Sequence, residues 1–243
     1  MVSYAFAINS LLISGFDAFN GASGNNSQVT AKNIVNTLKS EFPDKEIVFC
    51  QLRTVYHKAT ETLIDCANSM NQKPDLIISL GEAFCNKAKL ETRAYNWLSG
   101  SADNDGIQYN GTQNDDSFPK FVSQTIDWRD AYCALDDRDK NDLLLSNDAG
   151  SFVCNETLFN MNAKYSEFNM GFIHVPQASC GWRGNRKRAT AQRVVTNILR
   201  NLLQSQAIDK FSFPTNKNEA KELYNNATNA CDKDFFRRLK SSF

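Results

Sequence analysis

An excess of charge of either sign is missing from this sequence. Its 27 lysines and arginines are balanced by 27 aspartates and glutamates, so the formal net charge at pH 7 is +0. Such a chain has no overall basic field to attract nucleic acid and no acidic tail to suggest a basic partner. The balance favours a small or neutral substrate, and no nucleic acid is expected as a partner.

Long apolar runs and targeting signals are also scarce. No stretch approaches the ~20 apolar residues that a membrane span needs, so no membrane partner is expected. The opening Met1–Gly15 is apolar but lacks lysine and arginine, and its second half has the pattern of a β-strand, so a signal peptide is not favoured. We expect a cytoplasmic protein, with secretion as the alternative because of the cysteine content.

Metal-ligand spacing is absent among the seven cysteines, which are scattered and form no Cys-X-X-Cys pair. Neither a metal nor another cofactor is therefore expected. An odd number of cysteines leaves at least one thiol outside any intramolecular disulfide. The Gly-rich stretch GASGNN, residues 21–26, completes neither the phosphate-binding nor the dinucleotide-binding fingerprint.

What the sequence does contain is a regular alternation of strand and helix patterns. Short apolar runs bounded by Gly, Asn or Pro predict strands, and between several of them apolar residues recur with a helical period. The alternation predicts a single α/β domain, with a twisted, mostly parallel sheet and helices on both faces. The expected strands are Leu11–Ser14, Ile47–Leu52, Leu76–Leu80, Leu143–Ser146 and Phe172–Val175, and the expected helices include Thr30–Phe42, Ala59–Met70 and Ala189–Leu203.

Two regions depart from this alternation. The polar segment Ser99–Asn141 is too long for a simple connection, so we expect it to be loop-rich and near the rim of a functional site. Near the C-terminus, Phe235, Phe236 and Leu239 form a small amphipathic pattern of their own. We therefore divide the chain into an α/β domain, residues 1–204, and a C-terminal helical extension, residues 205–243, that packs on it and affects stability more than chemistry.

One of only two histidines, His174, lies in an apolar, strand-like run shortly after Cys154. Cys154 falls at the start of a predicted helix, Asn155–Ala163, where the helix dipole and free backbone N–H groups favour a thiolate and can receive an oxyanion. This helix leads the chain back along the sheet. We expect the strand with His174 to run up beside the strand Asp142–Asn147, which brings the imidazole to the level of the thiol. A Cys–His pair there is a nucleophile with its general base.

Each of these residues also has an ordinary structural interpretation. Cys154 can be a small buried apolar residue, and His174 a core histidine with its hydrogen bonds satisfied. The other histidine, His57, lies near the start of a predicted helix, and we interpret it as a solvated or capping side chain. Glu82 and Glu91 both follow the third expected strand. Either could fix the imidazole tautomer, and reasoning from the residues leaves this choice open.

Several segments together resemble pyroglutamyl peptidase I, the pyrrolidone-carboxylate peptidase family of cysteine peptidases. LLISGFDAFNG resembles the first strand and the Gly-Phe-Glu-Pro-Phe-Gly-Gly turn of that family, and PDLIISLGEA followed by LETRAYN resembles the strand and the segment that hold its catalytic glutamate. NDAGSFVCN resembles its nucleophile turn, and GFIHVP its histidine strand. These segments occur in the order of the family and span about Leu11–Leu203.

The resemblance implies roles for individual residues. It makes Cys154 the nucleophile, His174 the general base and later acid, and Glu91 the group that orients the imidazole. The implied reaction is hydrolysis of the amide after an N-terminal pyroglutamyl residue through a thioester acyl-enzyme, so the expected partner is a peptide with a blocked N-terminus. An aromatic pair would cradle the flat, mostly apolar pyrrolidone ring. The residues assigned to substrate binding are Phe16, Phe19, Glu82, Asn25 and Val153.

The chain also departs from the family pattern. GEAFCNK stands where many relatives have Gly-Gln-Ala-Gly-Gly-Arg, so Glu82 replaces a glutamine of the pocket. Ser99–Asp105 stands for the Ala-Arg-Ile-Pro-Asp-Asn stretch and holds no arginine for the oxyanion, a loss that can cost about 100-fold or more in rate. The alternatives are a related amidohydrolase with altered cap specificity and a catalytically weakened member that binds peptides. The sequence sets no oligomeric state, and a homo-oligomer is compatible with it.

Overall fold

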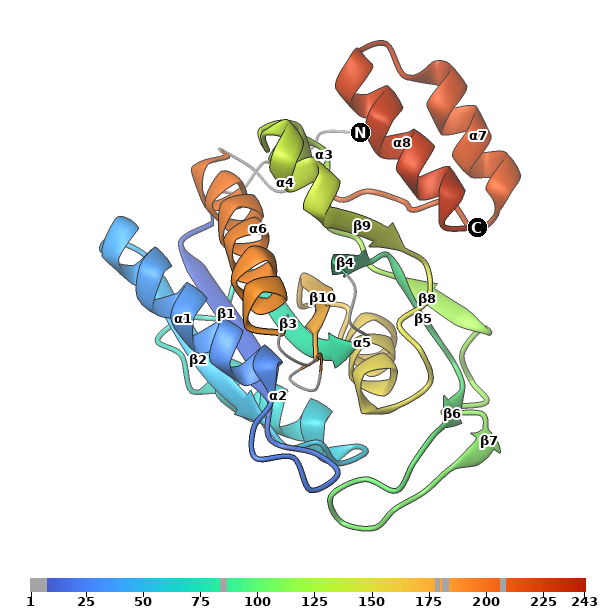
Figure 1. Ribbon diagram of the computed structural model, residues 1–243. Coiled ribbons are helices and arrows are strands. Elements are labelled where there is room, and N and C mark those ends of the chain that lie inside the picture. Colours follow the sequence, from blue (N-terminus) through green and yellow to red (C-terminus); the bar gives the residue numbers. More distant parts are fainter. Residues whose placement is uncertain (1–7, 84–86, 178–179, 181–183, 206–208) are drawn as a thin grey trace.

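The computed structural model describes residues 8–83, 87–177, 180, 184–205 and 209–243 of the chain (Figure 1). Cys85 and residues 1–7, where the segment considered as a signal peptide begins, lie outside these ranges. Within them, the central element is a six-stranded sheet with the strand order β2-β1-β3-β10-β4-β9. Its strands are β1 (Ser10–Phe16), β2 (Glu46–Leu52), β3 (Leu76–Ala83), β4 (Ala88–Glu91), β9 (Leu143–Ser146) and β10 (Met170–Pro176).

The sheet is mostly parallel, as predicted, and each of the expected strands is present. Strands β2, β1, β3 and β10 run parallel to one another, whereas β4 pairs antiparallel with β10 and parallel with β9. The prediction that the histidine strand runs beside Asp142–Asn147 is therefore wrong, because β4 lies between β9 and β10. The short connection from β3 to β4 leaves no room for the long crossover that a parallel strand requires, so β4 enters in the opposite direction.

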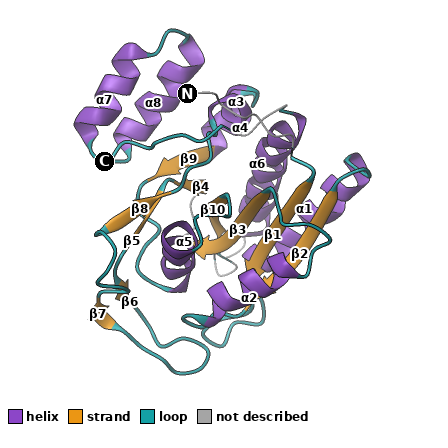
Figure 2. Cartoon of the chain, turned by 180° about the vertical axis from the view of Figure 1, so that it is seen from behind, coloured by secondary structure: helices purple, strands orange, loops and turns teal. Residues whose placement is uncertain are grey.

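Helices cover both faces of the sheet (Figures 1 and 2). Helices α1 and α6 pack together on one face, and α2 and α5 on the other. Alternate residues of β1 serve the two cores, because successive side chains of a strand point to opposite faces. Leu11 and Ile13 belong to the core on the α1 and α6 side, and Leu12 and Phe16 to the core beneath α2 and α5. The helices of these layers are α1 (Asn26–Glu41), α2 (Lys58–Asn68), α5 (Val153–Lys164) and α6 (Gly184–Gln204).

The segment Ser99–Asn141 contains only short elements in its described structure, which agrees with its loop-rich composition. Two small antiparallel pairs, β5 with β8 and β6 with β7, lie beside the main sheet. The elements between β4 and β9 are β5 (Arg93–Tyr95), β6 (Leu98–Ser99), β7 (Asn110–Thr112), β8 (Phe121–Ser123), α3 (Arg129–Cys133) and α4 (Asp137–Asp142).

The C-terminal residues form a pair of adjacent helices, α7 (Lys217–Asn226) and α8 (Ala230–Ser241), at one end of the sheet (Figure 1). The side chains of Phe235, Phe236 and Leu239 are buried in the same core as α6. Helix α8 contacts α3 and β9. The division of the chain at residue 204 stays a prediction. None of the helices in the described ranges is long and apolar enough to cross a membrane.

Candidate active site

The thiol of Cys154 lies at the start of α5, as its position in the sequence predicts. It belongs to the second residue of the helix, and the N-cap residue Phe152 makes no capping hydrogen bond through its side chain. The first N–H groups of a helix have no intrahelical partner, so those of α5 can stabilise a thiolate or an oxyanion. Cys154 is half-buried and is the free cysteine of the described ranges.

The imidazole of His174 lies between Cys154 and Glu91. Its Nδ1–H donates to Glu91 Oε1 at 2.8 Å, and the ring shares a further hydrogen bond with Cys154. Both partners of the His–Glu contact are buried, with His174 6% and Glu91 0% exposed. Of the two glutamates that the sequence left open, Glu91 is the one that holds the imidazole. Its second oxygen, Oε2, is buried and has no hydrogen-bond partner in the described part of the chain.

The charge on the imidazole follows from these neighbours. Burial by itself lowers the pKa of His174, but the hydrogen bonds to Cys154 and Glu91 and the charges of both groups outweigh it and raise the pKa from 6.5 to about 10. The raised pKa favours the protonated form of the imidazole at neutral pH. A cationic imidazole beside a thiol stabilises the thiolate, which is the nucleophilic form of cysteine.

Gly81 of β3 makes room for the thiol. It pairs with His174 across the sheet, and a Cβ atom at this position would lie 2.8 Å from both the Cys154 Sγ and the Phe172 Cζ atoms. Any larger residue would push the nucleophile away from the imidazole. An isolated glycine in a strand pattern indicates such a close approach, so the sequence did carry a signal for Gly81 that our reasoning did not use.

One cavity of about 700 Å³ adjoins the three residues. Glu82 and Lys89 from the sheet, the loop before α5, and Ser241 and Ser242 of the C-terminal helix also line it. No group of three or more His, Cys, Asp or Glu side chains in the described ranges could hold a metal ion. The arrangement places a thiol that is hydrogen-bonded to an imidazole next to this cavity.

Residues 9–180 match the family model described as pyroglutamyl peptidase. The chain belongs to this family. Among curated relatives, the pyrrolidone-carboxylate peptidase of Clostridium botulinum (strain Alaska E43 / Type E3) is 29% identical over 179 residues, which cover 68% of this chain and 78% of the relative. The pyrrolidone-carboxylate peptidase of Brachyspira hyodysenteriae (strain ATCC 49526 / WA1) is 31% identical, with 68% and 82% covered.

Solved structures of the pyroglutamyl peptidase family share the fold. The pyroglutamyl peptidase I of Bacillus amyloliquefaciens superposes with a TM-score of 0.64 at 22% identity and covers 81% of this chain and 98% of its own. A mutant pyrrolidone carboxyl peptidase from Pyrococcus furiosus gives a TM-score of 0.64 at 21% identity, with 80% and 98% covered. Almost the whole of each relative is thus matched, whereas this chain has additional residues.

The two phenylalanines assigned to the pyrrolidone ring differ in how deeply their side chains are buried. Phe16 is 1% exposed and its ring packs 6.3 Å from that of Phe172, inside the core. Phe19 is half-buried, and its ring centroid lies 4.9 Å from that of Phe152, next to the start of α5. Phe19 and Phe152 therefore form an aromatic pair at the start of α5, where Phe152 lines the cavity, whereas Phe16 packs against Phe172. Phe152 was missed at the sequence level, although it stands two residues before Cys154.

Asn25 and Val153 both lie at the N-terminal end of a helix. Asn25 is the N-cap of α1, where its Oδ1 accepts from the Ser27 N–H at 2.9 Å and its Nδ2 donates to the Asp17 carbonyl at 3.0 Å. Val153 is the first residue of α5 and is fully buried. Their assignment to substrate binding stays a prediction.

Glu82, the residue that replaces the family's glutamine, lines the same cavity as Cys154 and His174. Its Oε1 accepts a short hydrogen bond from the backbone N–H of Asn26, the first residue of α1. A helix N-terminus favours negative charge, so this contact favours the carboxylate form. In Ser99–Asp105, the segment that stands for the family's arginine stretch, a carboxylate also binds backbone groups. Asp103 accepts hydrogen bonds from the backbone N–H groups of Tyr56, Asp105 and Ile107.

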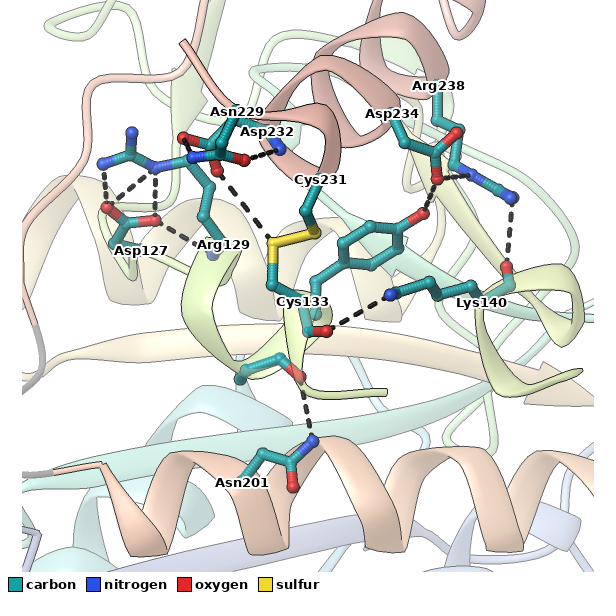
Figure 3. The surroundings of a disulfide bond; sticks show 12 residues. Asp127, Arg129, Cys133, Lys140, Asn201, Asn229, Cys231, Asp232, Asp234 and Arg238 are labelled. Atoms are coloured by element: carbon teal, nitrogen blue, oxygen red, sulfur yellow. Dashed lines mark hydrogen bonds and ion pairs between the residues drawn. A yellow bond between two sulfur atoms is a disulfide. The ribbon is translucent and has the colours of Figure 1, made fainter. Parts of the chain in front are cut away.

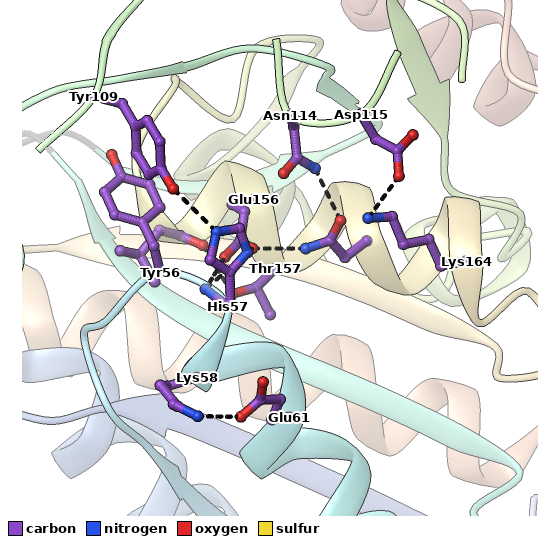
Figure 4. A network of polar contacts seen from close by, with 12 residues as sticks. Tyr56, His57, Lys58, Glu61, Tyr109, Asn114, Asp115, Glu156, Thr157 and Lys164 are labelled. Carbon is purple, nitrogen blue, oxygen red and sulfur yellow. Dashed lines mark hydrogen bonds and ion pairs between the residues drawn. The ribbon is translucent and has the colours of Figure 1, made fainter. Parts of the chain in front are cut away.

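His57 has a different carboxylate partner from that of His174 (Figure 4). It occupies the N-cap position of α2 with a φ of 64° and makes no capping hydrogen bond through its side chain. Instead its Nδ1 lies 2.9 Å from Oε1 of the buried Glu156, and its Nε2 lies 3.1 Å from the Tyr109 hydroxyl. The hydrogen bond to Glu156 raises the pKa of His57. The prediction of a solvated side chain is confirmed, because the His57 side chain is 49% exposed, whereas the capping role is not, because the side chain makes no capping hydrogen bond. The imidazole instead gives the carboxylate buried in α5 a partner.

Proposed function

We propose that this protein is a cysteine peptidase that removes an N-terminal pyroglutamyl residue from peptides through a thioester acyl-enzyme. The observation that carries the proposal is the hydrogen-bonded series Cys154, His174 and Glu91 in a chain of the pyroglutamyl peptidase family. The relatives that it matches are named pyrrolidone-carboxylate peptidases. A module that only binds peptides has no need of an activated thiol.

The raised pKa of His174 makes its imidazole the group that carries the proton in the proposed reaction. The His174 imidazole takes the proton of the Cys154 thiol, and the resulting thiolate adds to the carbonyl carbon of the pyroglutamyl residue. The oxyanion that forms is stabilised by the N–H groups at the start of α5. His174 then gives its proton to the leaving amine, the carbon–nitrogen bond breaks, and a thioester remains.

Hydrolysis of the thioester reverses these roles. His174, now neutral, accepts a proton from water, and the hydroxide equivalent adds to the thioester carbonyl. The second tetrahedral intermediate collapses to free pyroglutamate, and Cys154 returns as the thiolate beside the protonated imidazole. Glu91 keeps the Nδ1–H in place in both halves and stabilises the cation.

The cap specificity follows from an apolar surface and a carboxylate. Phe19 and Phe152 suit the flat pyrrolidone ring, and Glu82 offers only acceptors where a glutamine offers both donor and acceptor. Because Glu82 is already bound to the N–H of Asn26, we expect pyroglutamate to remain the preferred cap, with weaker recognition of its carbonyl. The alternative is a cap that carries a donor or a positive charge.

A panel of fluorogenic amides tests the function. The pyroglutamyl amide is assayed beside the prolyl, alanyl and acetylated analogues, which differ from it in the ring carbonyl, the ring or the free amine. Preferential release from the pyroglutamyl amide supports the proposal. Preference for prolyl or alanyl amides identifies the related amidohydrolase, and stoichiometric labelling of Cys154 without turnover of any amide identifies a peptide-binding protein.

We infer that the protein works in an oxidising compartment, which is the secreted alternative rather than the cytoplasm. Cys50 pairs with Cys66 and Cys133 with Cys231, and Cys180 is also disulfide-bonded. Disulfides persist in secreted proteins and are rare in the cytosol. Mass mapping of the protein from its source without reduction tests this; free thiols at Cys133 and Cys231 would contradict it.

A further inference from the structure

The C-terminal helix reaches the active-site cavity. Ser241, the last residue of α8, and Ser242, its C-cap, line the same space as Cys154 and His174. Both serines lie beyond residues 9–180, the part of the chain that matches the family model. One wall of this cavity is therefore built from residues that the family pattern does not include.

The order of strands shows which side of the scissile bond this wall faces. From β1 to β9 the strands follow one another as β1, β3, β10, β4 and β9, with α8 packed against β9. The aromatic surface of Phe19 and Phe152 lies toward β1, because Phe19 follows that strand. The cavity extends the opposite way, along Lys89 of β4 and Leu144 of β9 to Ser241. If the pyrrolidone ring occupies the aromatic side, the leaving peptide lies toward α8.

The wall is held rigidly in place by contacts with α3 and α4 (Figure 3). The disulfide between Cys133 and Cys231 joins the end of α3 to the start of α8. The Tyr132 hydroxyl donates to Asp234, which also accepts from Arg238 Nε at 2.9 Å. Because a covalent bond and a partly buried hydrogen-bond network fix the helix, it cannot move aside freely to admit a bulky substrate.

The residues after α8 are fixed to the segment that follows the catalytic glutamate. The Arg93 guanidinium, two residues after Glu91, lies 4.5 Å from the ring centroid of Phe243 and 4.7 Å from that of Phe121. Arg93 is 4% exposed and donates to the Thr215 carbonyl at 3.3 Å. Cation–π contacts in such a desolvated position are stronger than on the surface. The wall is thus anchored at its far end as well.

We propose that α8 and its C-cap form the leaving-peptide subsite of this enzyme and restrict it to short, unfolded pyroglutamyl peptides. The inference rests on the proposed function, because it assigns the part of the substrate that departs. A cavity of about 700 Å³ has the size of a small-molecule site, which holds a few residues of peptide. The serine hydroxyls give the wall a polar surface toward the backbone of the leaving peptide.

The test narrows the subsite and compares leaving groups. Ser241 is exposed, so Ser241→Trp is expected to fold, and Lys233→Trp is the matched control, an exposed residue of the same helix outside the cavity lining. The substrates are pyroglutamyl amide, which releases ammonia, and a series of pyroglutamyl peptides of increasing length. For Ser241→Trp, the ratio of kcat/KM for the long peptides to that for the amide falls by about tenfold or more. For Lys233→Trp the ratio stays at the wild-type value.

A second measurement does not depend on turnover. Cys154 is alkylated with iodoacetamide and with a bulky pyrenyl maleimide, and Ser241→Trp slows the bulky reagent by about tenfold more than the small one. The Cys133→Ser/Cys231→Ser double variant, which releases α8, accelerates the bulky reagent. If Ser241→Trp changes neither the peptide ratio nor the alkylation ratio, the subsite is overturned. If the wild-type protein hydrolyses no pyroglutamyl substrate while Ser241→Trp changes the alkylation ratio, the proposed reaction is wrong. The role of α8 in limiting access to Cys154 is then still supported.

Discussion

Glu91 reaches His174 diagonally across a pair of antiparallel strands. In the register of β10 and β4, Glu91 pairs with Phe172, and His174 pairs with Lys89. Residues two apart on a strand share a face, and diagonal neighbours remain within reach of long side chains. His174 is two residues beyond the residue that pairs with Glu91 and lies on the same face, so the carboxylate reaches Nδ1 at 2.8 Å. A parallel β4 would have given this pair a different register, so the Glu91–His174 contact depends on the reversed direction of β4.

Replacing Glu91 by Gln tests the electrostatic part of this contact. The amide oxygen can still accept the Nδ1–H, so we expect a partial loss of kcat, below the roughly 10⁴-fold loss that follows when the wrong tautomer is imposed. The alkaline limb of kcat/KM is the sharper readout. In the wild type it reports loss of the His174 proton near the raised pKa of about 10, and without the Glu91 charge it moves to lower pH. An unmoved alkaline limb would contradict the assignment.

The nucleophile is tested by Cys154→Ala. Hydrolysis of the pyroglutamyl amide is expected to fall by about 10⁶-fold, as when a catalytic nucleophile is removed from other hydrolases. The melting temperature should stay near that of the wild type, because the change removes only the sulfur of a half-buried side chain that lines the cavity. Appreciable turnover by the folded variant, measured after active-site titration to exclude traces of wild type, would refute the mechanism.

The two histidines should differ sharply. His174→Ala removes the proton carrier and is expected to be nearly as severe as Cys154→Ala. His57→Ala should leave kcat almost unchanged and instead lower the melting temperature, because the buried carboxylate of Glu156 loses its imidazole partner. Since the pKa of His57 is raised, this stabilisation is full below the ordinary value of 6.5 and declines as the pH rises through the folded-state value. Equal losses of kcat in both variants would contradict the assignment of proton transfer to His174 alone.

Glu82→Gln probes the cap pocket. A glutamine restores a donor for the lactam carbonyl, and we expect kcat/KM for pyroglutamyl substrates to rise by about fivefold, the net value of one neutral hydrogen bond. The gain is measured at several pH values between about pH 5 and 8. Substrates with a free N-terminal amine serve as the comparison. No change at any pH would place Glu82 outside the contact with the cap.

Local patterns in the sequence were enough for the parts of the site that lie on one element. The period of the apolar residues placed Cys154 at a helix N-terminus and His174 in a buried strand, because the side-chain period of each element is visible in any short stretch. The resemblance to the family then named Glu91. Nothing local distinguished it from Glu82, which follows the same strand pattern.

Long-range pairing decided the rest. Only the tertiary structure shows that β4 separates β9 from β10, that Phe16 is buried in the core and that Phe19 packs against Phe152. Only the tertiary structure brings Ser241, 87 residues after Cys154 in the printed sequence (241 minus 154), to the same cavity. Strand register and helix docking depend on which distant apolar faces are complementary. The sequence alone determined the main strands and helices and the Cys–His pair proposed for the reaction, because these depend on local patterns. Packing between the elements decided which residues surround that pair.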